Sequence, residues 1–157
     1  MATANSFVFH KSMENFMDGD APDWDTAPIA MALLGAANDC VATPAALLLT
    51  DLTLDESNDA SYTDKGDDGR VTLSTTVSES GGTVTFTASN VSSYTALDPG
   101  LDLEGILIFH AATSANVIDD GSSVPLVWVE FASAIDPGGS DFTITWNASG
   151  IVTIANS

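Results

Sequence analysis

The amino-acid sequence predicts an all-β protein, a single-domain antiparallel β-sandwich of the jelly-roll or immunoglobulin-like type, with a short N-terminal helix or arm. Short runs of residues are rich in Val, Ile, Thr, Phe and Trp, which favour strands. Apolar and hydroxyl side chains alternate along several of these runs, and turns that contain Gly or Pro separate them. We assign residues 1–22 to the N-terminal arm or helix and residues 23–157 to the sandwich domain.

The N-terminal arm is expected to contain a short helix at residues 10–17, ended by the Gly and Pro of residues 18–22. Four apolar side chains at i, i+4, i+7 and i+8 spacing would share one face of it: Phe9, Met13, Phe16 and Met17. A stripe of this kind ordinarily packs into the protein's own core. Its alternative role is contact with another subunit, and for that role we single out the stripe together with Phe7.

The next stretch is less regular. Residues 29–34 are apolar, and although Ala and Met favour a helix there, Pro28 and the short length favour a strand, which we predict. A brief helix could begin at Thr43-Pro44, and the three leucines at 47–49 are expected to be buried. Residues 51–68 are acidic and rich in turn-forming residues, which predicts a long surface loop of the kind that often carries binding surfaces.

The strand pattern then becomes regular. Apolar and hydroxyl residues alternate in 71–78 and again in 83–89, and Gly81-Gly82 between them predicts a hairpin with one apolar and one hydroxyl face. Such a hydroxyl face can form a subunit contact without burying charge. Residues 105–109 are apolar on both faces, which is typical of a central strand.

The last third contains three strand-like runs at 124–131, 141–147 and 151–155, separated by Asp136-Pro-Gly-Gly139 and Asn147-Ala-Ser-Gly150. We expect these runs to pair consecutively as an antiparallel meander. The first run is apolar on both faces around 126–129, which indicates a place in mid-sheet. In the second run, apolar residues alternate with polar ones, which indicates one buried and one polar face.

The charge balance limits the partners. Of the 157 residues, 22 are acidic and three are basic, so the net charge is −19. Phosphate backbones and anionic membrane surfaces would repel such a chain, so we expect neither nucleic acid nor a membrane as partner. The apolar stretches are also too short to cross a bilayer. A high negative charge does suit a protein displayed in water at high local density.

Cysteine and leader patterns bear on the compartment. Cys40 is the single cysteine, so no internal disulfide can form, and without a nearby His or CxxC pattern we expect it to be a buried apolar residue. The start of the chain lacks a basic segment followed by an apolar one, so we see no secretion signal there. We therefore expect the chain to fold in a reducing cytoplasm.

No motif for catalysis is present in the sequence. HExxH, GxSxG and Gly-rich phosphate loops are missing, and His10 and His110 lie in different segments, so we expect no enzymatic activity, no cofactor and structural roles for both histidines. The acidic run at 64–69 departs from a calcium loop because Gly66 and Thr75 stand where ligands belong. We therefore expect no metal. The residues that would bind one are Asp64, Asp67 and Asp68, with a second acidic cluster at Asp18, Asp20, Asp23 and Asp25.

The three tryptophans are expected to divide into two kinds. Trp128 and Trp146 lie within strongly apolar runs and are expected in the core. Trp24 lies between Asp23 and Asp25, and we expect it to be the exposed one. It is therefore the residue that would face a ligand such as a sugar.

Several blocks of the sequence, from about residue 15 onward, resemble small virion structural proteins of tailed bacteriophages, of the capsid decoration (cement) type. These blocks are Asn15-Phe16, Asp25-Thr-Ala-Pro-Ile-Ala-Met-Ala-Leu-Leu34, Glu104-Gly-Ile-Leu-Ile-Phe109, Ser123-Val-Pro-Leu-Val127 and Gly139-Ser-Asp-Phe-Thr-Ile-Thr-Trp-Asn-Ala-Ser-Gly-Ile151. The Asp-Phe-Thr-Ile-Thr-Trp-Asn part of the last block is the most specific.

The resemblance implies a non-enzymatic phage structural protein, made in the host bacterial cytoplasm. The leading hypothesis is a decoration protein that binds the major capsid protein on the outer surface of the head, as a homo-oligomer such as a trimer, and stabilises the shell. The expected contact surface is the N-terminal segment before Pro22 together with a hydroxyl-faced strand. The alternative is a receptor- or carbohydrate-binding module in a tail fibre or knob, in which Trp24 and the acidic loop would recognise the ligand.

Overall fold

The computed structural model describes residues 5–19, 23–25, 27–56, 70–97, 100, 102–111 and 121–155. Strands make up most of the regular structure in these ranges and all their pairings are antiparallel, so the expected all-β, sandwich-like fold is confirmed. The elements in chain order are β1 (Phe7–Val8), α1 (His10–Asp18), β2 (Ile29–Gly35), the 3-10 turn η1 (Leu49–Asp51), β3 (Val71–Thr72), β4 (Thr75–Ser80), β5 (Thr83–Ala88), β6 (Val91–Leu97), β7 (Leu103–His110), β8 (Val124–Ile135), β9 (Ser140–Ile144) and β10 (Val152–Ala155).

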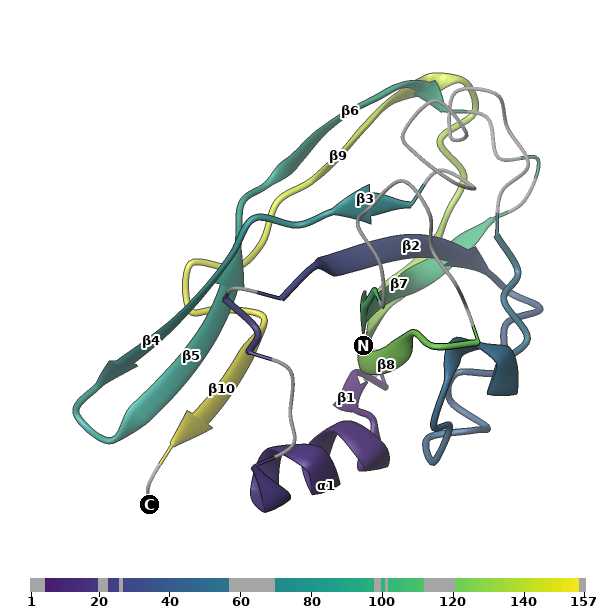
Figure 1. Ribbon diagram of the computed structural model, residues 1–157. Helices are drawn as coiled ribbons and strands as arrows, with labels where there is room; N and C mark the ends of the chain where they lie inside the picture. The colour runs from purple at the N-terminus through teal and green to yellow at the C-terminus, as the bar shows by residue number, and fades with distance from the viewer. Residues whose placement is uncertain are drawn as a thin grey trace.

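A five-stranded sheet in the order β1-β8-β7-β2-β3 forms the middle of the molecule (Figure 1). Its three inner strands are the runs that are apolar on both faces, and every residue of β2 is buried. Side chains alternate between the faces: Met31 of β2 lies in one apolar cluster, whereas Ala32 lies in the other. The predicted strand at 29–34 and the two predicted central strands are therefore confirmed.

Each face of this sheet has its own cover. On one face, Met31 and Ile108 pack with Phe86 of β5, Tyr94 of β6 and Ile144 of β9. On the other face, the irregular segment 36–54 supplies the cover, and its buried residues pack against the sheet together with Phe9: Cys40, Ala46, Leu49 and Leu52. A sheet covered on both faces explains why residues 29–34, 105–109 and 126–129 of its inner strands lack polar side chains.

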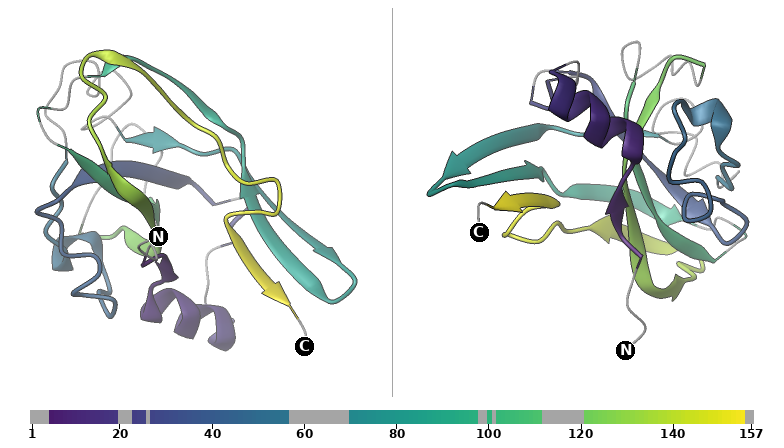
Figure 2. Two further views of the ribbon diagram at one scale, coloured as in Figure 1. Left: turned by 180° about the vertical axis from the view of Figure 1, so that it is seen from behind. Right: turned by 90° about the horizontal axis from the view of Figure 1, so that it is seen from below.

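The remaining strands form two smaller sheets, β10-β5-β4 and β6-β9. The predicted hairpin is present in part: β4 and β5 pair from Thr75 opposite Ala88 to Ser80 opposite Thr83, and Gly81 and Gly82 turn with positive φ values of 60° and 79°. The predicted first strand, 71–78, is split, because Val71–Thr72 forms β3 and pairs with β2 of the five-stranded sheet. The views in Figures 1 and 2 show β4, β5 and β10 extending beyond the five-stranded sheet like an arm.

The predicted meander of the last third is wrong. All three runs form strands, but β8 pairs with β7 and β1, β9 pairs with β6, and β10 pairs with β5. The both-face apolar β8 belongs between covering layers, whereas β9, with one apolar face, belongs in such a layer. The segment 136–139 therefore carries the chain from one sheet to another instead of closing a hairpin.

The predicted N-terminal helix is confirmed as α1. It is anchored on β8 and on the covering segment: the Phe9 amide donates to the Leu126 carbonyl (2.9 Å), the His10 amide to Pro44 (3.0 Å), and the Ser12 hydroxyl to Pro125 (2.7 Å). Gly19, with φ of 79°, ends the helix. The predicted boundary between residues 22 and 23 stays a prediction.

The expectation that all three leucines at 47–49 are buried is wrong for Leu47, which is exposed, and for Leu48, which is half-buried. The Asp51 carboxylate accepts hydrogen bonds from the amides of both residues, at 2.9 and 3.0 Å, and holds them in a surface turn. No helix begins at Pro44, where the chain forms turns, and the 3-10 turn η1 follows.

A buried ion pair joins Glu56, within the predicted acidic loop 51–68, to Arg70, which follows that loop. The Arg70 guanidinium contacts the Glu56 carboxylate at 2.5 Å and through two further bonds of 3.1 and 3.2 Å, and it lies over the Phe109 ring at 5.5 Å. Glu56 also bridges Leu34 on β2. The loop between them, residues 57–69, lies outside the described residues, so the predictions for Asp64, Asp67 and Asp68 are not tested.

Candidate functional site

A groove of about 450 Å³ runs between α1 and the three-stranded sheet, and we call it the helix groove. Apolar side chains from both elements line it, together with two aspartates. The lining residues are Val8, Ser12, Met13, Phe16, Gly19, Asp23, Trp24, Asp25, Val77, Val84, Phe86, Val152 and Ile154. The groove thus joins part of the predicted contact stripe to the apolar face of the projecting sheet.

Aromatic rings connect the helix to the sheet. The Phe16 and Trp24 ring centroids lie 6.4 Å apart, and those of Trp24 and Phe86 lie 4.8 Å apart at 77°, an edge-to-face arrangement. Trp24 is only 8% exposed, so the prediction that this tryptophan is the exposed one is wrong. Its ring packs between a helix and a strand that are distant in sequence, which its acidic sequence neighbours did not reveal.

The predicted contact residues have different environments. Met13 and Phe16 are each 51% exposed on the groove wall, and Met17 is 84% exposed on the helix surface. Phe7 is half-buried in β1, and Phe9 is fully buried beneath the five-stranded sheet. Phe9 is therefore a core residue, and the interpretation of the stripe as core packing holds for it but not for the exposed three.

Across the groove, the apolar wall belongs to residues that the sequence did not single out as contacts. Val77, Val84 and Phe86 share one face of β4 and β5, and Ile154 of β10, opposite Val84, is 52% exposed. The alternation of apolar and hydroxyl residues does predict this face. The helix that lies beside it, and hence the groove, follows only from the three-dimensional arrangement.

Two negatively charged residues belong to the groove lining. Asp23 and Asp25 are exposed and lie close together, and the hydrogen bond with the Asp23 carboxylate, aided by its charge, raises the pKa of Asp25. The nearest cation in sequence on α1, Lys11, contacts Glu14 at 2.9 Å. The groove therefore combines a mostly apolar lining with two carboxylates.

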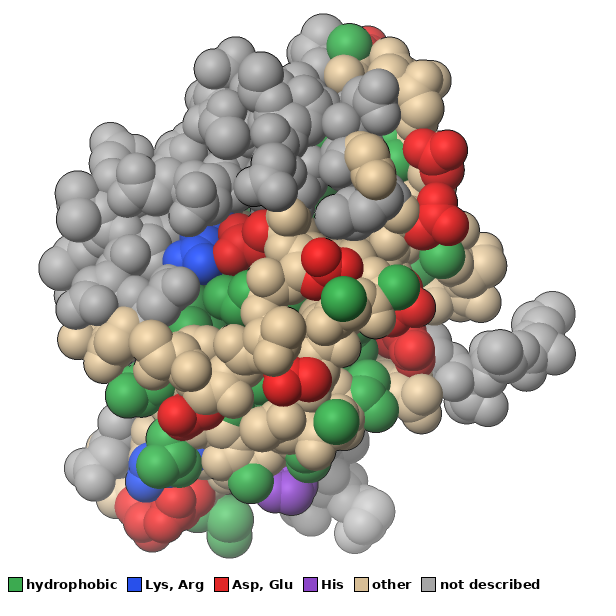
Figure 3. Space-filling view, turned by 90° about the vertical axis from the view of Figure 1, so that its right-hand side faces the viewer, with side chains coloured by type: hydrophobic (Ala, Val, Ile, Leu, Met, Phe, Trp, Pro, Cys, Tyr) green, Lys and Arg blue, Asp and Glu red, His purple; other side chains and the backbone are tan. Residues whose placement is uncertain are grey.

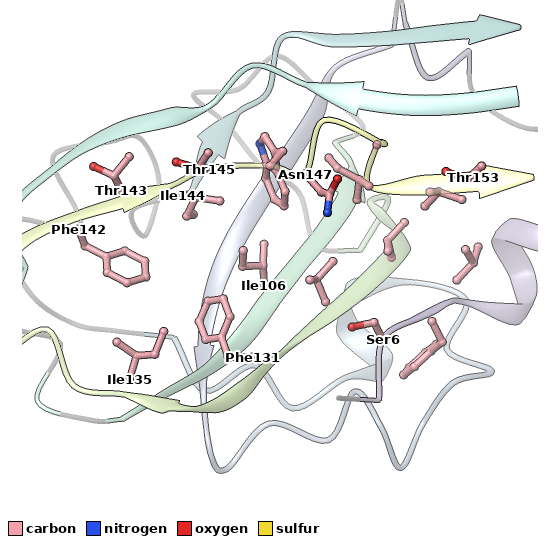
Figure 4. A pocket seen from close by; sticks show the side chains of 18 residues that line it. Ser6, Ile106, Phe131, Ile135, Phe142, Thr143, Ile144, Thr145, Asn147 and Thr153 are labelled. Carbon is pink, nitrogen blue, oxygen red and sulfur yellow. The ribbon is translucent and has the colours of Figure 1, made fainter. Parts of the chain in front are cut away.

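A second hollow, of about 650 Å³, opens between β8 and the segment from β9 to β10, and we call it the lateral cleft. Figure 4 shows Phe131 and Ile135 from β8 and Phe142 from β9 turned into it, with Ile106 of β7 at its floor. Rings of Phe131 and Phe142 lie 6.4 Å apart. Every residue that lines the cleft is uncharged, and several of them, such as Ile106, Val127 and Ile144, belong to the apolar core. The cleft is therefore a gap at the side of the sandwich where the core is not fully covered.

Hydroxyl side chains cover the opposite face of the projecting sheet, as the alternation predicts. Their positions follow the strand register: Thr76, Ser78 and Ser80 on β4, Thr83, Thr85 and Thr87 on β5, and Thr153 on β10. This is a hydroxyl-faced surface of the kind the sequence predicts for a contact.

The described residues bring together no group of three or more His, Cys, Asp or Glu that would hold a metal ion. His10 lies exposed at the start of α1, whereas His110 ends β7, where burial lowers its pKa. Cys40 is buried as predicted, and burial, together with the charge of Asp39, raises its pKa to about 12. None of these three residues lines the helix groove.

The prediction that Trp128 and Trp146 lie in the core is confirmed for Trp128 and only partly for Trp146. Trp128 is buried against Leu107 and Phe109. Trp146 is half-buried at the edge of the core, and its indole nitrogen donates to the Ser89 carbonyl at 3.1 Å. Neither offers an exposed ring platform.

The surface is acidic. Figure 3 shows Asp and Glu side chains scattered over one face among hydrophobic and uncharged ones, while basic side chains are sparse. Among the helices in the described ranges, none has the length and apolar character needed to cross a membrane. Comparisons of the chain with protein-family models, with curated proteins and with solved structures gave no match.

Proposed function

We propose that this chain is a bacteriophage virion structural protein, a decoration protein that binds the major capsid protein on the outside of the head and stabilises the shell. The sequence resemblance to virion proteins supports the class. The observation that carries the contact role is the half-exposed apolar wall of the helix groove, Met13, Phe16 and Ile154, on a chain of net charge −19. Apolar patches on an otherwise highly charged surface are typical of interaction sites.

The proposed mechanism is physical. A folded plate that binds across neighbouring shell subunits adds apolar contact that must be lost before the subunits separate. Each Å² of apolar surface removed from water contributes about 25 cal/mol, so even a small interface becomes large when many copies bind. The double cover of the five-stranded sheet keeps the plate itself rigid enough to transmit that contact.

The charge favours the outer surface of the head. A chain with 22 acids and three bases beside packed DNA would meet strong repulsion, whereas on the outside the same charge keeps neighbouring virions apart. The expected homo-oligomer, such as a trimer, remains part of the proposal. Sedimentation velocity of the purified chain measures it directly.

The test is binding to purified shells that lack this chain. We expect saturable co-sedimentation and a higher temperature of shell disruption once the sites are filled. Phe16→Ser should reduce binding at least tenfold, whereas Leu47→Ser, which changes a comparably exposed apolar residue outside the groove, should not. Shells that bind none of the chain would contradict the proposal, as would cryo-microscopy density for it on the tail alone.

The tail-module alternative loses its main support because the Trp24 ring is buried between α1 and β5. Glycan binding that disappears in Trp24→Ala, with the fold intact by circular dichroism, would restore it. A glycan array and the shell assay thus separate the two functions.

A further inference from the structure

We propose that the helix groove binds an extended or helical segment of the shell subunit whose apolar side chains are flanked by Lys or Arg. This inference rests on the proposed function and names the partner chemistry of its contact site. The structure supplies two independent arguments for it, one from the apolar walls and one from the charges in and beside the groove.

Apolar side chains of β4 and β10 remain exposed to water along the groove. β2, which is apolar on both faces, is buried along its whole length, whereas β4, which carries Val77 on its apolar face, is exposed from Thr76 to Ser80. Val77 and Ile154 face α1 across the groove but remain 36% and 52% exposed. Apolar side chains inserted between Phe16 and these residues would remove all of them from water at once.

The charge argument selects among apolar partners. Asp23 and Asp25 belong to the groove lining, Asp18 ends the adjoining helix, and Glu79 follows Val77 on the same face of β4. Asp23 and Asp25 lie two residues apart and both line the groove, so their carboxylates repel each other, and the hydrogen bond with Asp23 and its charge raise the pKa of Asp25. A lysine or arginine brought by the partner would relieve that repulsion and gain charge-assisted hydrogen bonds.

A second copy of this chain fits the groove poorly by the same argument. Its surface has the same excess of acids, so its approach would place further carboxylates beside Asp23 and Asp25. A basic, apolar segment meets opposite charge instead. The partner is therefore a different chain.

The first experiment uses three synthetic peptides of equal length and titrates them into the full chain by calorimetry and two-dimensional NMR. One peptide has a Leu-Phe-Leu centre with two Lys on each side, the second replaces Lys by Glu, and the third keeps Lys but has a Ser-Asn-Ser centre. We expect the first to bind at least tenfold more tightly than the others, with shifts confined to α1, β4, β5 and β10. Binding should weaken as salt rises.

Matched variants locate the site. Phe16→Ser and Ile154→Ser should each lower the affinity for the first peptide at least fivefold. The controls Leu47→Ser and Val41→Ser, which change exposed apolar residues outside the groove, should leave this affinity unchanged. The double variant Asp23→Asn/Asp25→Asn should lower the affinity for the first peptide severalfold and make that affinity less dependent on salt. The control Asp102→Asn/Glu104→Gln removes two charges elsewhere and should leave both quantities unchanged.

The outcomes separate the groove from the decoration function. Shells that bind wild type and groove variants equally would overturn the groove inference and leave the function standing. Peptide binding in the groove without any shell binding would support the groove's partner chemistry and overturn the function. Equal binding of all three peptides, or a chain dimer at micromolar concentration that Phe16→Ser dissolves, would overturn the inference.

Discussion

The five-stranded sheet and the projecting sheet β10-β5-β4 are built from similar strand-forming residues but have opposite relations to water. The first is covered on both faces, by β5, β6 and β9 on one side and by segment 36–54 on the other. The second has one hydroxyl face and one apolar face that α1 covers only in part. Covered strands hold the fold together, whereas partly covered strands are available for contact.

The same contrast appears in the ion pairs. Arg70 and Glu56 are 4% and 13% exposed, and their pair lies against the five-stranded sheet. Lys11 and Glu14 are 34% and 59% exposed on α1 beside the projecting sheet. An exposed pair is worth little because water and salt screen it, whereas removing one partner of a buried pair leaves an unpaired charge.

The largest effect is therefore expected for Arg70→Ala. It should lower the free energy of unfolding by about 3–5 kcal/mol, because the Glu56 carboxylate would remain buried without its cation. Lys11→Ala, the control, should change it by less than about 0.5 kcal/mol. Urea unfolding followed by tryptophan fluorescence measures both. Equal losses in the two variants would contradict the contrast between the regions.

Gly105→Ala is a second substitution that should destabilise the central sheet. A Cβ at this position would lie 2.6 Å from the Trp128 ring and from the Val129 carbonyl, so the cost is overpacking, about 1–3 kcal/mol. Thermal unfolding measures the loss. In a Trp128→Leu background the ring no longer fills this space, so the same substitution should cost less. Identical costs in both backgrounds would contradict the role of the ring and assign the clash to the Val129 carbonyl.

Much of the central sheet could be predicted from the sequence, because local pattern and burial agree there. Residues 105–109 and 126–129 are apolar on both faces, and only a place between two covers satisfies such strands. Pairing in the last third could not be predicted. Turn residues indicate where a chain reverses, but whether β9 pairs with β8 or crosses to β6 depends on which layer buries its single apolar face.

The candidate site could be predicted only in part, because the sequence pattern is local whereas the groove is formed by segments that are distant in sequence. Helical spacing identified Met13 and Phe16, and alternation identified the apolar face of the hairpin, but no local pattern states that these surfaces lie side by side. Trp24 was misjudged because its acidic neighbours suggested water, whereas Phe86, 62 positions later in the chain, covers its ring. Phe9 was grouped with Met13, Phe16 and Met17 in one helical stripe, although it precedes the helix and is buried beneath the sheet.

A smaller effect on stability is expected on the projecting sheet. Ile154→Ala should change the free energy of unfolding by less than about 0.5 kcal/mol, because its side chain is already half in water. The matched variant Ile108→Ala, in the core between the sheets, should lose about 2–5 kcal/mol. Chemical denaturation of the two variants side by side provides the measurement. A large loss for Ile154→Ala would show that the projecting sheet belongs to the stabilising core after all.

The smallest effect concerns the two aspartates of the groove lining, Asp23 and Asp25. Hydrogen bonding to Asp23 and its charge raise the pKa of Asp25, so the folded chain holds this proton more tightly than the unfolded chain. The resulting stabilisation is present below the unfolded pKa of 3.8 and is lost as the pH rises through the raised folded value. Asp25→Asn should therefore slightly raise the melting temperature at pH 7 and flatten its dependence on pH in the acidic range. Asp102→Asn removes the same charge from another exposed site, so a gain no larger than that of this control would show that repulsion across the whole chain, and not the Asp23–Asp25 contact, sets the effect.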